Sequence, residues 1–197
     1  MTSEAVLDLF RQSGALLDGH FRLTSGLHSA GYMQCALVLQ HPVHAEAIGR
    51  AIGEWARALA PTVVLSPALG GVVIGHEVAR ALGVRALFAE RQDGVLRLRR
   101  GFSLDDRDRV LVVEDVLTTG GSTPETIDVA TGAGAGVVGA AAIVDRGGGA
   151  SRFDVPFKAL LEYALATYDP GKCPLCAQGL PVVKPGSRTE EAALPNT

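Results

Sequence analysis

Between residues 63 and 144 the sequence alternates short apolar runs with segments of helical pattern. The run that starts at Arg109 is almost wholly apolar, as expected for a strand that is covered on both faces. Strands that alternate with helices in this way predict an α/β fold, in which a mostly parallel central sheet with right-handed crossovers is flanked by helices. The predicted strands are 63–66, 85–90, 109–114 and 136–144, and the predicted helices run from about 71 to 82 and from 123 onward.

The region before this pattern predicts a helix and an irregular hairpin. Thr2 and Ser3 can cap a first helix, and the stretch 21–35 reads as two short strands with glycine turns. Pro42 suits the first turn of a long helix with an apolar stripe.

A chain of 197 residues has the length of one large domain. We expect a single domain over 1–168, made of a helix and hairpin at 1–40 and a core at 41–168, followed by a Pro-rich tail at 169–197. The longest apolar runs fall short of the roughly 20 residues that a membrane span needs. With three cysteines and no visible secretory signal, we expect a cytoplasmic protein.

The charge is balanced overall and concentrated locally. A net charge of −3 disfavours the binding of nucleic-acid polymers through broad electrostatics. Four arginines nevertheless stand against one aspartate between Arg91 and Arg100, which gives that segment a local charge of +3.

The most informative segment is 110–123, Val-Leu-Val-Val-Glu-Asp-Val-Leu-Thr-Thr-Gly-Gly-Ser-Thr. A buried strand ends in Glu114 and Asp115, and a glycine turn then opens onto a helix, whose backbone N–H groups suit a phosphate. The two carboxylates suit ribose hydroxyls or hydrated Mg²⁺ next to that phosphate. The pattern predicts a site for a ribose 5-phosphate, with a plain capped strand-to-helix turn as the alternative.

Two other phosphate motifs are excluded. The segment lacks the Gly-Lys-Ser/Thr ending of a P-loop. A formal G-x-G-x-x-G at 134–139 leads from a helix into a strand, which is the reverse of what dinucleotide binding needs.

Residues 112–123 resemble the phosphoribosyl-pyrophosphate (PRPP) signature of type I phosphoribosyltransferases. Within that superfamily, Phe-Arg-Leu-Thr-Ser-Gly-Leu-His-Ser-Ala-Gly-Tyr at 21–32 is similar to the F-x-L-x-S-G-x-x-S-x-x-Y stretch of orotate phosphoribosyltransferases. The resemblance extends from about Phe10 to Tyr163. It implies a type I phosphoribosyltransferase-like fold with an N-terminal, hood-like hairpin region.

The resemblance also implies the PRPP site. Glu114 and Asp115 would hold the ribose hydroxyls, and the loop 66–72 would contact the pyrophosphate, although an ordinary strand-to-helix turn is an alternative for that loop. The residues implied in PRPP binding are Gly70, Gly71, Arg91, Glu114, Asp115, Val116, Leu117, Thr118, Thr119, Gly120, Gly121 and Ser122. Mg²⁺ would be held mainly by substrate and water, near the two carboxylates.

The orotate site implied by the resemblance comprises Thr118, Arg146, Ser25 and Gly26. A guanidinium at Arg146 can grip a carboxylate in a bidentate manner, and orotate offers a carboxylate that uracil lacks. A solvent-facing arginine at the end of a strand is the alternative.

The segment 90–102 matches the family's mobile catalytic loop in position. Catalytic roles are thereby implied for Asp115 and for the arginines of this loop, which are Arg91, Arg97, Arg99 and Arg100. The better-known bacterial pattern has lysines and a histidine in this loop, which this chain lacks, and Thr24 stands where many relatives carry lysine. The later arginines could equally form the solvent face of a hairpin. In related enzymes the loop reaches the neighbouring subunit's site, which implies a homodimer.

The function implied is Mg²⁺-dependent transfer of ribose 5-phosphate from PRPP to orotate, a pentosyltransferase step of pyrimidine synthesis. A purine or uracil phosphoribosyltransferase and a PRPP-sensing regulator without turnover are the alternatives. The expected partners are PRPP, orotate and a second copy of the chain, with neither nucleic acid nor membrane.

Cys173 and Cys176 resemble half a zinc site, because structural zinc needs four ligands and this tail supplies two. Two copies across a dimer could complete such a site, or the pair could be redox-active. We interpret the pair as a local feature of the tail. The five histidines do not cluster at metal-ligand spacings along the sequence, and we assign them ordinary structural or surface roles, although His28 could approach the base site.

Overall fold

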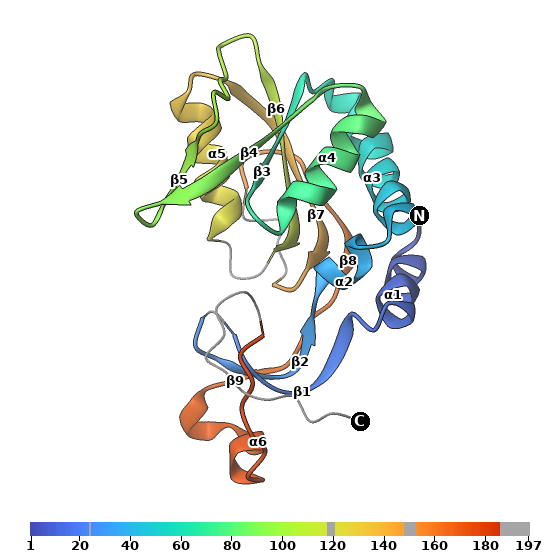
Figure 1. Cartoon of the computed structure of the whole chain (residues 1–197), viewed down its shortest axis with the longest axis vertical. Coiled ribbons are helices and arrows are strands. Elements are labelled where there is room, and N and C mark those ends of the chain that lie inside the picture. Colours follow the sequence, from blue (N-terminus) through green and yellow to red (C-terminus); the bar gives the residue numbers. More distant parts are fainter. Residues whose placement is uncertain (24, 118–120, 148–152, 186–197) are drawn as a thin grey trace.

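The computed structural model describes residues 1–23, 25–117, 121–147 and 153–185. It contains a six-stranded sheet covered by helices and a smaller three-stranded sheet beside it (Figure 1). The strands are β1 (Leu16–Arg22), β2 (His28–Met33), β3 (Val63–Pro67), β4 (Arg85–Gln92), β5 (Val95–Leu98), β6 (Arg109–Leu117), β7 (Gly136–Asp145), β8 (Phe157–Glu162) and β9 (Thr167–Tyr168). The helices are α1 (Ser3–Gln12), α2 (Cys35–Leu39), α3 (Pro42–Ala56), η1 (Arg57–Leu59), α4 (Gly71–Leu82), α5 (Ser122–Gly132), η3 (Pro170–Lys172) and α6 (Pro174–Ala177).

The larger sheet confirms the predicted α/β fold. Its strand order is β5-β4-β3-β6-β7-β8, and every neighbouring pair is parallel except the β4–β5 hairpin. All four strands predicted from the apolar runs are present. The sequence analysis did not predict the edge strand β8, because Phe157-Lys-Ala-Leu-Leu-Glu is short and lies outside the regular strand–helix alternation.

The strands of this sheet are buried on both faces, as predicted for the apolar run from Arg109. Val64 and Leu111 belong to the apolar cluster under α3 and α4, whereas Val63, Leu65 and Val112 belong to a second cluster that includes residues of α5. Successive side chains of a strand point to opposite faces, so a run of consecutive apolar residues fills both clusters.

The three-stranded sheet has the order β1-β2-β9 and is built on the predicted N-terminal hairpin. It forms the lower part of the molecule in Figure 1, together with α6. Part of the C-terminal tail also pairs with β1: the Arg22 N–H donates to Val183 O, and the Val183 N–H donates to His20 O, both at 2.8 Å. The tail is therefore tied to the hairpin over its described length.

The helices follow the expected local signals. Thr2 caps α1 by accepting a hydrogen bond from the Ala5 N–H at 3.2 Å, and Pro42 opens α3. In the part of the chain that the structure describes, no helix combines the length and apolar character required to cross a membrane.

The strand order determines where a ligand can bind. The chain places β4 and β5 on one side of β3 and then returns to place β6 on the other side. Open α/β sheets bind ligands at such a reversal, beyond the carboxyl ends of the strands, which here are β3 and β6. The two loops that carry the predicted PRPP-binding residues follow these two strands.

Helix α3 offers a matched test of the core. Ile52 is fully buried, whereas Val43 is 76% exposed on the same helix. We expect Ile52→Ala to lower the free energy of unfolding by about 2–5 kcal/mol, because it removes buried methyl groups and leaves a cavity. Val43→Ala should change it by less than about 0.5 kcal/mol. Urea unfolding followed by circular dichroism measures both, and equal losses would contradict the described core.

Candidate active site

Glu114 and Asp115 lie near the carboxyl end of β6, which continues beyond them to Leu117, whereas the sequence predicted that the strand would end at this pair. Glu114 is only 6% exposed, and its carboxylate accepts hydrogen bonds from the hydroxyls of Ser122 and Thr123 at the start of α5. The strand end and the helix start are thereby joined through one carboxylate.

Burial shapes the electrostatics of this acidic pair. Desolvation raises the pKa of Glu114, the two hydroxyl donors oppose that rise, and the charges of Asp115 and Glu125 add to it. Burial also raises the pKa of Asp115, against the backbone N–H groups of Val116 and Asp115 itself. A buried carboxylate next to a partly buried one is costly, which is typical of a site built for a ligand.

The glycine loop after β3 lies directly against this pair. A Cβ built on Gly70 would lie 2.5 Å from Asp115 Oδ2, and one on Gly71 would lie 3.1 Å from Val113 O. The peptide bond between Ala68 and Leu69 is cis, and Leu69 is 82% exposed. The two segments that the resemblance assigned to one ligand are therefore neighbours in space, and only glycine allows this approach.

Arg146 follows β7 at the same edge of the sheet. Its backbone N–H donates to Leu117 O at 2.8 Å, which holds it beside the end of β6. Burial lowers the pKa of its half-buried guanidinium, and the charge of Tyr32 opposes this. Its Nε is buried and has no hydrogen-bond partner among the described residues. A partly desolvated guanidinium with a free donor suits a planar anion such as a carboxylate.

Tyr32, on β2, brings the hairpin to this site, and the sequence analysis did not single it out. Burial and the charge of Asp115 raise the pKa of its phenol, and the charge of Arg146 lowers it. Tyr32 is therefore close enough to interact electrostatically with both residues. The sequence signal that could have identified Tyr32 as a site residue was its position as the last residue of the family-like stretch 21–32.

The arginine-rich segment forms the β4–β5 hairpin, which was one of the two interpretations left open. Arg91 makes two hydrogen bonds, of 2.8 and 3.1 Å, to the carboxylate of Glu125 in the first turn of α5. Arg100 pairs with Glu90 through bonds of 2.7 and 2.8 Å. Arg97 and Arg99 are exposed. Arg91 thus lies beside the helix that carries Ser122, whereas Arg97 lies on β5 and Arg99 and Arg100 follow that strand.

The structure describes some of the remaining predicted site residues and not others. Ser25 and Gly26 lie in the exposed turn between β1 and β2, which is closed by a 2.8 Å hydrogen bond from the Leu23 N–H to Leu27 O. Gly121 is exposed directly before α5, while Val116 and Leu117 complete β6. Thr24, Thr118, Thr119 and Gly120 lie outside the described residues.

The donor set at this site fits magnesium. Glu114 and Asp115 offer hard carboxylate oxygens, and Mg²⁺ in phosphate sites is commonly held by one or two carboxylates together with substrate oxygens and water.

Comparison with known proteins identifies the protein family. The phosphoribosyl transferase domain family matches residues 37–164, which include the sheet edge and both loops. A solved orotate phosphoribosyltransferase from Aeropyrum pernix superposes with a TM-score of 0.68 at 25% identity, covering 80% of this chain and 93% of that one. An adenine phosphoribosyltransferase from Trypanosoma brucei shares the fold, with a TM-score of 0.59 at 17% identity, over 78% of this chain and 79% of that one.

Proteins with similar sequences identify the family within the phosphoribosyltransferases more closely. Orotate phosphoribosyltransferase from Pelotomaculum thermopropionicum is 52% identical over 95% of this chain and 99% of that protein. The orotate phosphoribosyltransferase of Heliobacterium modesticaldum is also 52% identical, over 96% of this chain and all of that protein. The chain belongs to the orotate phosphoribosyltransferase family of type I phosphoribosyltransferases.

The burial of Glu114 predicts a pH-dependent stability. Because its pKa is raised above the ordinary 4.5, ionisation is less favourable in the folded chain than in the unfolded chain. The contribution of Glu114 to the free energy of unfolding is fully present below pH 4.5, where the carboxyl is protonated in both states. It is lost as the pH rises through the raised pKa of the folded chain. Glu114→Gln cannot ionise, so we expect it to raise the Tm at pH 7.5 and to have almost no effect below pH 4.5.

Differential scanning calorimetry at both pH values, without ligand, measures this effect. The exposed Glu54 provides the control, since Glu54→Gln should leave the Tm nearly unchanged at either pH. A Glu114→Gln protein that is less stable than the wild type at pH 7.5 would contradict the assignment.

Proposed function

We propose that this chain is an orotate phosphoribosyltransferase that works in the cytoplasm in the synthesis of pyrimidine nucleotides. It transfers the ribose 5-phosphate of PRPP to orotate and yields orotidine 5′-phosphate and pyrophosphate. The observation that carries the proposal is the identity of 52% with orotate phosphoribosyltransferases over nearly the whole chain. The buried acidic pair against the Gly70 loop gives the reaction a site of suitable chemistry.

The ribose and its phosphate bind between β6 and α5. Glu114 and Asp115 accept hydrogen bonds from the ribose hydroxyls, which relieves the cost of burying both carboxylates. The turn from Thr118 to Ser122, together with Val116 and Leu117 before it, holds the 5-phosphate at the amino end of α5. Gly70 and Gly71 let backbone amides approach the pyrophosphate closely.

The reaction is a displacement at C1 of the ribose. A bond forms from an orotate ring nitrogen to C1, and the bond from C1 to a pyrophosphate oxygen breaks, so that its electron pair leaves with pyrophosphate. The proton of the ring nitrogen is released to pyrophosphate or water. The ring becomes cationic in the transition state, so Asp115, next to the ribose, stabilises the developing charge and holds the reacting geometry. No covalent nucleophile is needed.

Magnesium is the expected cofactor. Glu114 and Asp115 would hold it together with substrate oxygens and water, and when bound it would neutralise charge on the departing pyrophosphate. The arginines of the β4–β5 hairpin, Arg91, Arg97, Arg99 and Arg100, supply further positive charge for the leaving group. The hairpin extends from the edge of the sheet (Figure 1), from which it would reach the site of a second subunit in a homodimer.

Arg146 gives the site its preference for orotate. Its buried Nε, at the same sheet edge as Asp115 and without a partner in the part of the chain that the structure describes, is ready to bind the orotate carboxylate. Thr118 and the turn carrying Ser25 and Gly26 complete the base site, and Tyr32 closes it from the hairpin side. Uracil and purine bases lack the carboxylate and would leave the guanidinium without its partner.

Base selectivity tests the proposal directly. Pyrophosphate release is followed with PRPP, Mg²⁺ and either orotate, uracil, adenine or hypoxanthine. We expect turnover with orotate at least about 100-fold faster than with the other bases, because the charge-assisted bidentate contact is made by orotate alone. Turnover of a purine or uracil instead, or PRPP binding without turnover of any base, overturns it.

Arg146→Ala tests the role of this arginine. We expect kcat/KM for orotate to fall by about 10- to 100-fold, because one charged hydrogen-bonded contact of about 1.5–3 kcal/mol is lost. PRPP affinity, measured by calorimetry, should change by less than about twofold. The control is Arg107→Ala, whose side chain is 86% exposed near the opposite end of β6. Equal losses for orotate and PRPP would show that Arg146 is misassigned.

Gly70→Ala tests the contact between the glycine loop and the acidic pair. The added Cβ would lie 2.5 Å from Asp115 Oδ2 and must displace that carboxylate, so we expect PRPP affinity to fall by about tenfold or more. Gly132→Ala is the matched control, because a Cβ there meets nothing within 4 Å. Unchanged PRPP affinity in Gly70→Ala would remove Asp115 from the PRPP site.

A further inference from the structure

Four potential metal ligands meet on the three-stranded sheet, away from the site described above. His20 lies on β1, His28 begins β2, Cys173 follows η3, and Cys176 lies in α6. The sequence showed only the two cysteines as a pair, because Cys173 is 153 residues from His20 along the chain. The fold supplies the two ligands that the tail lacks, within one chain and without a second copy.

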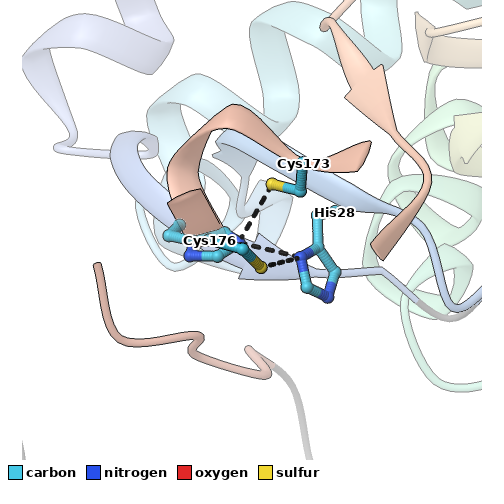
Figure 2. A group of neighbouring side chains, drawn as sticks. His28, Cys173 and Cys176 are labelled. Atoms are coloured by element: carbon cyan, nitrogen blue, oxygen red, sulfur yellow. Dashed lines mark hydrogen bonds between the residues drawn. The ribbon is translucent and has the colours of Figure 1, made fainter. Parts of the chain in front are cut away.

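Three of the separations match those of a tetrahedral zinc site, and the separation between the two histidine nitrogens is shorter. His20 Nε2 lies 2.8 Å from His28 Nδ1, 3.4 Å from Cys173 Sγ and 3.8 Å from Cys176 Sγ. Cys176 Sγ lies 3.3 Å from His28 Nδ1, and all four ligand atoms lie within 4.8 Å of one another. Ligands of tetrahedral zinc are about 3.3–3.8 Å apart, given its bond lengths to nitrogen and sulfur. Figure 2 shows His28, Cys173 and Cys176 directed toward one another.

The outer contact of His20 favours metal binding. Its Nδ1 lies 2.9 Å from the carbonyl oxygen of Leu180, so it carries the proton and donates to that oxygen. The other nitrogen, Nε2, then has a free lone pair directed at the other three ligand atoms. Metal-bound histidines commonly donate their second N–H to a carbonyl in this way. Nε2 can accept a hydrogen bond from one of those three groups, whereas one cation can bind all four atoms.

The ligand chemistry selects the metal. Two thiolates with two imidazoles suit zinc, while Mg²⁺ prefers oxygen ligands. Cys173 and Cys176 are free thiols in the structure. We propose that His20, His28, Cys173 and Cys176 bind one Zn²⁺ per chain in a closed, structural site. With four protein ligands, this site has no open position for a substrate.

The site has a clear structural purpose, because the tail has little core of its own. Helix α6 has only four residues and no buried side chain, and an isolated helix of that length is not stable in water. Among the described residues of the tail after residue 169, Cys173 alone is buried. Zinc therefore fastens the tail to β1 and β2.

The metal also holds the turn between β1 and β2. His20 and His28 flank this turn, which carries Ser25 and Gly26. If the proposed function holds, zinc orders a part of the orotate site without touching substrate. This consequence rests on the proposed function, whereas the metal site itself does not.

Metal content of the purified, untagged protein tests the site. We expect one zinc per chain by mass spectrometry, and less than about a tenth of that in Cys176→Ser and in His28→Asn, because a closed structural site needs all four ligands. The matched controls are Cys35→Ala and His41→Asn, at a cysteine and a histidine outside the cluster, which should keep one zinc. Since Cys176 is exposed, its substitution leaves the core intact.

Cobalt substitution tests the coordination without any variant. The Co²⁺ protein should show the intense visible bands of tetrahedral coordination and a thiolate charge-transfer band, both lost when Zn²⁺ is added back. A wild-type protein that neither contains zinc nor binds added Zn²⁺ or Co²⁺ overturns the proposal. A Cys173–Cys176 disulfide in fresh protein, or equal zinc in wild type and both ligand variants, also overturns it.

The activity readout separates the two proposals. Removal of zinc by a mercurial reagent and a chelator should lower the Tm and raise the KM for orotate, with less effect on PRPP affinity. Zinc binding in a protein that never turns over orotate would sustain the metal site and reject the proposed function. Turnover of orotate in a protein that neither contains zinc as purified nor binds added Zn²⁺ would sustain the proposed function and reject the metal site.

Discussion

The cost of placing the buried Glu114 next to the partly buried Asp115, near the carboxyl end of β6, is the constraint around which the core is arranged. Glu114 is held by two hydroxyls from the start of α5, and Asp115 lies against the backbone at Gly70. Burial raises the pKa of both groups, so neither is fully compensated by its own surroundings. A ligand rich in hydroxyl groups and accompanied by a cation would supply what is missing. The fold thus stores part of the binding energy for its substrate.

The reversal of strand order makes this arrangement possible. Because β4 and β6 lie on opposite sides of β3, the loops after β3 and β6 meet at a single edge of the sheet. The N-terminal hairpin then covers that edge and brings Tyr32 within electrostatic reach of Asp115 and Arg146. The small sheet has little interior, and the cluster of two histidines and two cysteines compensates by joining the tail to the hairpin.

Much of the core could be predicted from local patterns. The apolar run at the start of β6, the cap at Thr2 and Pro42 at the start of α3 each act within a few residues, so their consequences can be read directly. Glu114 and Asp115 were predicted as site residues from the end of an apolar strand, and Arg146 from the family resemblance. They lie at one edge because the carboxyl ends of parallel strands share an edge. The edge strand β8 was missed, since an isolated short strand has no local signal that separates it from a loop.

The sequence by itself determined the class of fold, the family and the chemistry of the site, because the strand periodicity and the signature at 112–123 are contiguous. The tertiary structure alone decided which distant residues meet. No local pattern places Gly70 against Asp115, and none places His20 and His28 beside a cysteine pair some 150 residues away. Such contacts depend on strand order and on the path of the tail, and those depend on how the whole chain buries its apolar surface.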